Sequence, residues 1–182
     1  MNRLLTVTCL LVAANTGLKA QAGFHVDAER SSLQFQGTAA FKEVEGTFSK
    51  IEVESIEYLG YATSLKGRIG ITINSLSTGK PVRDIHLKSS DFFDAERFPK
   101  AYIDVISVTE DQGSYFVHFA LEIHGIRIEY QEPIDLKTTW NTIEAKGGVL
   151  INRTDFGIQG NLLTNTIIGN EIKLAYSIVL VR

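Results

Sequence analysis

Four histidines, His25, His86, His118 and His124, are the side chains of this sequence best suited to metal binding or acid–base chemistry. A metal site needs several ligands close together, yet the sequence contains no His-x-His or His-x-x-x-His pair. His118 and His124 would share a strand face but lie roughly 20 Å apart in an extended strand, too far to hold one ion. The histidines therefore predict no metal site.

Motifs for nucleophilic catalysis and for phosphate binding are also missing. The sequence has no Gly-x-Ser-x-Gly turn to present a serine nucleophile and no glycine-rich phosphate loop. His86 with Asp84 or Asp91 is a combination that could act as acid and base. Ser and Asp residues in such a segment more often cap helices and form turns, so the sequence assigns no catalytic residue and implies no cofactor.

A second polar cluster follows an apolar segment, in the stretch 151–158, which reads INRTDFGI. Arg153 and Asp155 are two residues apart and would face the same way in an extended chain. There they could pair with charged residues of the segment 83–94, or they could simply solvate a turn. The functional alternative places both charges at the polar rim of an apolar cavity.

The elements that position these residues are predicted by alternation of apolar and polar side chains, which is typical of β-strands. Alternation is clearest over 69–73, 115–130 and 172–180, and further strands are expected over 24–26, 32–36, 48–58, 102–108 and 143–151. Between Val53 and Ile56 the apolar phase shifts, as a bulge or a barrel corner requires. Short polar turns between segments indicate antiparallel neighbours, and strands that are apolar on both faces favour a closed barrel or a sandwich.

One segment, 77–99, shows no alternation and contains two of the three prolines. Pro81 suits the first turn of a helix. We therefore expect a short helical excursion around residues 80–98, between two strands. Long non-strand insertions in compact barrels are usually lids, plugs or binding loops.

The first 22 residues have the layout of a secretory signal peptide. A short basic start precedes the apolar run 4–14, and small residues, Ala20 and Ala22, stand before the expected cleavage site. The run is shorter than the roughly 20 residues that span a bilayer. The sequence thus predicts a cleaved signal peptide over 1–22, a mature chain over 23–182 that does not span a membrane, and a periplasmic or secreted location.

Composition and charge exclude several classes of protein. The 182 residues are 44% apolar and 21% charged, and the single cysteine, Cys9, lies in the predicted signal peptide. The mature chain carries 16 basic and 21 acidic residues, a net charge of −5, which offers no basic surface to nucleic acid. We expect a globular domain that is stabilised by its core instead of by disulfides and that does not bind nucleic acid.

Four motifs together resemble the YceI-like family of exported bacterial proteins. They are Ser75–Gly79, Arg83–Ser89 with Asp91–Asp94 and Phe98–Pro99, Leu121–Gly125, and Ile151–Ile158. Their order and spacing agree along nearly the whole mature chain. The resemblance implies an all-β fold, an antiparallel eight-stranded lipocalin-like barrel, as a single YceI-like lipid-binding domain over 23–182. It also implies binding of a polyisoprenoid lipid, such as an isoprenoid quinone, in an apolar tunnel.

The leading hypothesis is a non-enzymatic binder of an amphiphilic, isoprenoid-type lipid. Near the mouth of the tunnel we expect polar groups at Asp84, His86, Asp91, Arg153 and Asp155, and apolar lining or a plug at Phe92, Phe93, Phe98 and Phe156. Two alternatives stay open. One is an enzyme that acts on a small lipophilic substrate with His86 and a neighbouring aspartate, and the other is an interaction module whose barrel is filled by its own side chains. Transient contact with a membrane and a homodimer are both compatible with the leading hypothesis.

Overall fold

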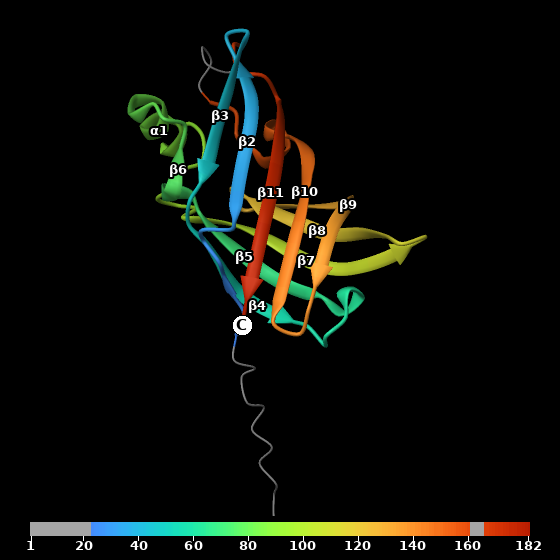
Figure 1. Cartoon of the computed structure of the whole chain (residues 1–182). Coiled ribbons are helices and arrows are strands. Elements are labelled where there is room, and N and C mark those ends of the chain that lie inside the picture. The colour runs from blue at the N-terminus through green and yellow to red at the C-terminus, as the bar shows by residue number, and fades with distance from the viewer. Residues whose placement is uncertain (1–22, 161–165) are drawn as a thin grey trace, which may run out of the picture.

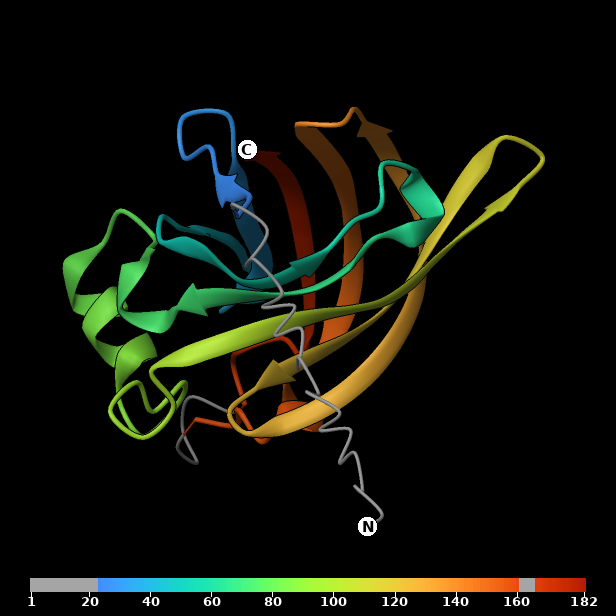
Figure 2. The ribbon, with the colours of Figure 1, turned by 90° about the horizontal axis from the view of Figure 1, so that it is seen from below.

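The computed structural model describes residues 23–160 and 166–182, so the predicted signal peptide lies outside the described residues. In this part of the chain an antiparallel sheet curls around a central core (Figure 1, Figure 2). Its strands are β1 (His25–Val26), β2 (Ser32–Ala39), β3 (Lys42–Phe48), β4 (Ile51–Glu57), β5 (Lys66–Thr72), β6 (Leu76–Ser77), β7 (Lys100–Asp111), β8 (Ser114–Ile123), β9 (Ile126–Thr138), β10 (Thr142–Asn152) and β11 (Glu171–Val181). The all-β, lipocalin-like architecture expected from the sequence is confirmed.

The strand order is β4-β5-β7-β8-β9-β10-β11-β2-β3-β6, and β1 pairs with the end of β11. Only Ser49 and Lys50 separate β3 from β4, and only the short 3₁₀ helix η2 (Ile73–Ser75) separates β5 from β6. Ser49 N donates to Ser75 O (3.4 Å) and Thr72 N to Lys50 O (3.0 Å), which joins the β3–β6 pairing to the β4–β5 pairing. The sheet therefore curls back to itself at this corner. The structure has eleven strands among the described residues, so the strand count differs slightly from the eight that were expected. Much of the difference arises because β3 with β4, and β5 with β6, are nearly continuous runs and β1 has only two residues.

Bulges bend the strands at this corner and beside it. The register between β4 and β5 shifts between Val53 and Ser55, which confirms the predicted change of phase. A second shift lies between Val105 and Ser107, where β7 pairs with β8. An extra residue in one strand increases its local twist and bend, which is how a sheet turns a corner.

The excursion between β6 and β7 is also confirmed, although only its first part is helical. Helix α1 (Pro81–Lys88) carries Pro81 in its first turn, where a missing N–H costs no hydrogen bond. Asp84 ties the helix to the end of β6 by accepting from Thr78 N (2.8 Å) and Thr78 Oγ1 (2.5 Å). Residues 89–98 form turns, in which Ser89 O accepts from the backbone N–H groups of Phe92 and Asp94.

Inward-facing side chains of the curled sheet form a single hydrophobic core. Among the most deeply buried are Ile73, Leu76, Ile143 and Phe156. None of the helices in residues 23–160 and 166–182 has the length and apolar character needed to cross a membrane.

Candidate ligand-binding cavity

The barrel interior holds two neighbouring cavities. The larger has a volume of about 300 Å³ and lies toward the end that carries α1 and the β2–β3 turn, whereas the smaller has about 100 Å³ and lies toward the opposite end. One layer of side chains, Leu33, Ile103, Leu121 and Leu174, lines both. The larger volume is at the lower end of the range of roughly 300–1,000 Å³ found for small-ligand pockets.

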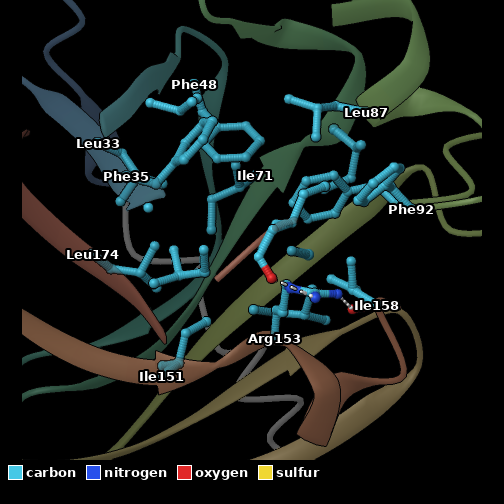
Figure 3. Close-up of a pocket in the computed structure, with 18 of the residues that line it drawn as sticks. Leu33, Phe35, Phe48, Ile71, Leu87, Phe92, Ile151, Arg153, Ile158 and Leu174 are labelled. Carbon is cyan, nitrogen blue, oxygen red and sulfur yellow. Dashed lines mark hydrogen bonds between the residues drawn. The ribbon is translucent and has the colours of Figure 1, made fainter. Parts of the chain in front are cut away.

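Strand geometry makes the lining of the larger cavity apolar. Every second residue of a strand faces inward, so Leu121 and Ile123 enter from β8, and Ile172 and Leu174 from β11. Figure 3 shows how Leu33, Phe35, Phe48, Ile71, Ile151 and Leu174 surround the space from the strands, with Leu87 of α1 and Phe92 of the following turn on one side. The cavity can therefore accept a hydrocarbon chain.

Polar side chains enter this lining at only a few positions. Among the described residues these are Thr38, Arg83, His86, Tyr102 and Arg153, and no aspartate or glutamate lines the cavity. Their polar atoms contribute almost nothing to the surface of the cavity, so a bound molecule would meet mainly carbon and no carboxylate.

Arg153 is buried at one end of the cavity, with 4% of its surface exposed. Its guanidinium donates to backbone oxygens of Ile158 (2.7 Å), Gly169 (3.0 Å) and Ile168 (3.1 Å) and to Asn170 Oδ1 (3.0 Å). Figure 3 shows the guanidinium beside Ile158. Burial lowers the pKa of Arg153 because desolvation penalises the charged form. The side chain fastens the turn after β10 to the segment that leads into β11.

Helix α1 presents Arg83 and His86 to the same cavity. Arg83 donates from Nε to Thr78 Oγ1 (2.7 Å) and from Nη2 to Thr78 O (2.9 Å). His86 Nε2 lies 3.4 Å from Asp91 Oδ2, and its ring meets the ring of Phe92 edge-on at a centroid distance of 5.0 Å. The side chains of His86 and Asp91 are 42% and 44% exposed, so solvent screens this pair and its contribution is small.

Comparison with known proteins identifies the family. The YceI-like domain matches residues 24–180 of the sequence. The chain belongs to the YceI-like family. A relative, the UPF0312 protein SA2479 of Staphylococcus aureus (strain N315), is 30% identical over 165 residues, which cover 85% of this chain and 94% of that protein.

Solved structures share the fold of this YceI-like protein. BcnA of Burkholderia cenocepacia superposes with a TM-score of 0.75 at 20% identity, over 85% of this chain and 98% of that chain. A polyisoprenoid binding domain from Saccharophagus degradans, implicated in plant cell wall breakdown, gives a TM-score of 0.69 at 17% identity, over 87% and 97% of the two chains. At these identities the likeness establishes the fold.

Four of the nine side chains that the sequence placed at the mouth line the larger cavity of this YceI-like protein. They are His86, Phe92, Phe93 and Arg153. Asp84 and Asp91 lie next to this group without lining the cavity, since Asp84 holds Thr78 and Asp91 contacts His86.

The other three of the nine lie away from the cavity lining. Phe98 packs against His124, with ring centroids 4.5 Å apart. Asp155 is exposed, and Phe156 is completely buried in the core. The structure therefore brings His86, Phe92 and Phe93 of the excursion together with Arg153, and it places Phe98, Asp155 and Phe156 outside the cavity lining.

The extended geometry assumed for Arg153 and Asp155 is wrong, because residues 153–156 form the 3₁₀ helix η3 (Arg153–Phe156). Three residues complete a turn of such a helix, so positions two apart point in different directions. Asn152 caps the turn by accepting from Thr154 N (3.0 Å), and Gly157, with φ +70°, ends it. Arg153 consequently points inward to neutral oxygens of the described residues, whereas Asp155 points to water.

Sequence reasoning missed several residues that line the cavity. Phe35 and Val44 come from the two strands of the first hairpin, and Ile172 comes from an alternating strand that had been recognised. Arg83 stands directly before Asp84 in a motif that was singled out. Alternation predicts on which side of a strand a residue such as Ile172 lies, but it does not predict which inward positions border empty space. It gives no direction for Val44, whose strand was not predicted, or for Arg83, which lies in the segment without alternation.

No group of three or more His, Cys, Asp or Glu side chains that could hold a metal ion occurs among residues 23–160 and 166–182.

Proposed function

We propose that this YceI-like protein binds an amphiphilic lipid of the isoprenoid type in the larger cavity and releases it unchanged. The observation that carries the proposal is a space of about 300 Å³ enclosed by apolar side chains. An apolar space of this size lowers stability while it is empty, because the lining loses its packing contacts. The alternative of a barrel filled by its own side chains does not agree with this volume.

The lining supports a branched hydrocarbon chain as the bound part of the ligand. Burial of each CH₂ group contributes about 0.8 kcal/mol, so a few isoprene units suffice for useful affinity. The smaller cavity continues beyond the shared layer of Leu33, Ile103, Leu121 and Leu174, and small movements there would extend the space for a longer chain. The fold shared with the polyisoprenoid binding domain from S. degradans supports the isoprenoid class.

The polar groups of the lining orient the ligand. The polar side chains Arg83 and His86 border the cavity at the α1 end, and the lining contains no carboxylate among the described residues. A head group with hydrogen-bond acceptors, such as the carbonyl oxygens of a quinone, would therefore lie at this end, with its tail directed toward the middle of the barrel.

The enzyme alternative rests on the contact between His86 and Asp91. Both side chains of that pair are exposed to solvent, which screens their interaction and makes them a poor acid–base pair. Binding without chemistry explains the apolar lining without a further assumption. We also propose that the protein acts in the periplasm or outside the cell, which rests on the signal-peptide pattern of residues 1–22.

The direct test is to purify the protein from its native host and analyse the co-purifying lipid by mass spectrometry. We expect an unmodified isoprenoid, and we expect titration with isoprenoid quinones and polyprenols of graded length to give saturable binding. Absence of any isoprenoid in the extract, together with no binding in the titration, would overturn the proposal. A chemically altered lipid would favour the enzyme instead.

A cavity-filling variant tests the location of the site. Ala101 is buried in β7 and lines the larger cavity, so Ala101→Leu places three more carbon atoms in the space that the ligand would occupy. We expect binding to weaken by about tenfold or more, with stability retained. The matched control is Ala175→Leu, at an exposed position of β11, which should bind like the wild type. Equal binding by both variants would place the site elsewhere.

A further inference from the structure

Large apolar side chains project into solvent at the end of the barrel that holds the larger cavity. Phe41 is 106% exposed, Val82 83%, Ile85 72% and Ile167 53%. They come from the turn between β2 and β3, from α1, and from the segment before β11, where Ile167 O accepts from Ala40 N (2.8 Å). Figure 1 shows the β2–β3 turn and α1 at the same end of the molecule. Single exposed apolar residues are ordinary, but this group comes from three segments at the same end of the barrel.

Phe41 stands where a phenyl side chain is unfavourable for the isolated protein. Ala40 and Phe41 both have positive φ, +48° and +63°. The turns Gln112-Gly113 and His124-Gly125 have the same sign pattern and place glycine second, as this kind of two-residue hairpin turn prefers. At the position of that glycine this turn has Phe41, a bulky residue whose side chain packs against no other residue. Packing within the folded chain therefore does not explain a phenylalanine here.

Two of the three large apolar side chains of helix α1, Val82 and Ile85, point outward, whereas Leu87 lines the cavity. A surface helix normally buries its apolar face and exposes its charged one. Here Arg83 and His86 face the cavity, while Val82 and Ile85 point to solvent. The outer face of α1 therefore suits an apolar environment outside the protein.

We infer that this end of the barrel docks onto the surface of a lipid bilayer, with Phe41, Val82 and Ile85 inserted among the lipids. Separate apolar tips on three segments do not make the flat surface that a folded partner needs, whereas a fluid bilayer surrounds each tip. Ile167 both lines the cavity and reaches solvent, so an apolar path leads from the cavity to the docking surface. The inference rests on the proposed function, because the bilayer is where an isoprenoid lipid would be taken up or delivered.

Charge supports a bilayer that contains anionic lipids. Lys42 follows Phe41, although Glu43 comes next, and Lys80 and Lys88 stand at the two ends of α1. Residues 80–88 carry a net charge of +2, with three basic residues against Asp84, whereas the whole sequence carries −3. Cations next to apolar tips are the usual arrangement of interfacial membrane contacts.

The test is flotation of the purified protein with vesicles of phosphatidylethanolamine and phosphatidylglycerol, and with vesicles of phosphatidylcholine alone. We expect binding to the first and weaker binding to the second. The variant Phe41→Asn/Val82→Ser/Ile85→Ser should lose binding by about tenfold or more, because three apolar side chains no longer enter the interface. The matched control is Leu59→Ser/Tyr61→Ser/Trp140→Ser, which changes side chains that are 73%, 56% and 72% exposed at the opposite end.

The outcomes separate this inference from the proposed function. All six positions are exposed, and Asn tolerates positive φ, so both variants should fold. Native mass spectrometry of lipid bound from detergent solution reports the cavity alone, and it should be the same for both variants. Two results would overturn the docking surface and leave the proposed lipid binding intact. One is a wild-type protein that binds lipid in its cavity but does not float with vesicles, and the other is an equal loss of vesicle binding in the two variants. A homodimer that the first variant dissociates would overturn it too, by showing that a second copy covers these residues.

Discussion

The two ends of the barrel are closed in different ways, although the same alternation of side chains lines both. At the end formed by β1, β4 and the 3₁₀ helix η1 (Ala62–Ser64), Phe24 and Tyr58 are buried and pack edge-on with ring centroids 5.9 Å apart. The guanidinium of Arg182 lies 4.7 Å from the ring centroid of Phe24. Aromatic rings occupy this end, and the cavity beside it has only about 100 Å³.

At the α1 end, side-chain hydrogen bonds join the segments that cover the barrel, although ring contacts such as Phe48 with Phe93, centroids 6.2 Å apart, occur there as well. Arg153 holds backbone oxygens of two segments, and Arg83 and Asp84 both hold Thr78. Such contacts join the covering segments without filling the interior, and about 300 Å³ stays open. Alternation along the strands thus determines that the interior is apolar, but the residues that cover each end determine whether it becomes packed core or cavity.

The largest effect is expected from Arg153→Met, which removes the hydrogen bonds that hold the α1 end. The oxygens of Ile158, Ile168 and Gly169 would lose a donor while the aliphatic bulk is kept. Each buried polar group left unpaired costs about 1–3 kcal/mol, so we expect a loss of at least about 3 kcal/mol in the free energy of unfolding. Urea denaturation measures it, and Arg153→Lys should fall between the variant and the wild type. Wild-type stability of the Met variant would show that the α1 end is held by other contacts.

Smaller effects are expected from substitutions of two phenylalanines at this end, one in the core and one in the cavity lining. Phe156 is fully buried and does not line the cavity, whereas Phe93 does. Phe156→Leu should lower the free energy of unfolding by on the order of 1–2 kcal/mol and leave lipid affinity unchanged. Phe93→Leu should change lipid affinity with a smaller loss of stability. The reverse pattern, measured by urea denaturation and lipid titration, would mean that the ligand reaches Phe156.

The sequence was informative where one periodicity acts over several residues. Alternation predicted most of the strands but missed β3 and β6. The shift of phase near Val53 predicted the bulge and Pro81 predicted the start of a helix, because each signal depends on local backbone geometry. Four of the nine predicted site residues line the larger cavity for a related reason. The excursion had to cover an end of the barrel, so side chains on its inner face were bound to meet the interior.

The positions of Asp155 and Phe156 could not be predicted in the same way. Asn152 and Gly157 could end a strand in several types of turn, and only the 3₁₀ turn rotates Asp155 outward and Phe156 into the core. The exposed side chains of Val82 and Ile85 illustrate the same limit, because the pattern of apolar residues does not predict that they point away from the protein. That requires knowing what α1 packs against.

Acidification should loosen the α1 end while leaving the other end intact. The pKa of Asp84 is lowered, chiefly by the hydrogen bond from Thr78 Oγ1 and further by the Thr78 N–H and by Lys88 and Arg83. A carboxylate whose pKa is lower in the folded than in the unfolded state stabilises the folded protein. This stabilisation is complete at pH values above the unfolded pKa, which is about 3.9 for Asp, and it is lost as the pH falls through the folded pKa. Hydrogen exchange of α1 should therefore speed up at acidic pH relative to that of β10. Asp84→Asn should show fast exchange already at neutral pH, and an unchanged exchange rate would contradict the role of this carboxylate.

The smallest predicted change lies at the ring-filled end, where the hydroxyl of Tyr58 is buried without a hydrogen-bond partner among the described residues. Tyr58→Phe removes that polar atom and keeps the edge-on contact with Phe24, so we expect the free energy of unfolding to rise by up to about 1 kcal/mol. Tyr61→Phe, at an exposed tyrosine of the same end, should leave stability unchanged. Thermal denaturation of the two variants decides the matter. A gain at Tyr58 alone would mean that the hydroxyl adds nothing to the stability of this end, in contrast to the side-chain hydrogen bonds of Arg153 and Asp84 at the α1 end. A loss at Tyr58 would show that the hydroxyl is hydrogen-bonded, and the two ends would then both depend on polar contacts.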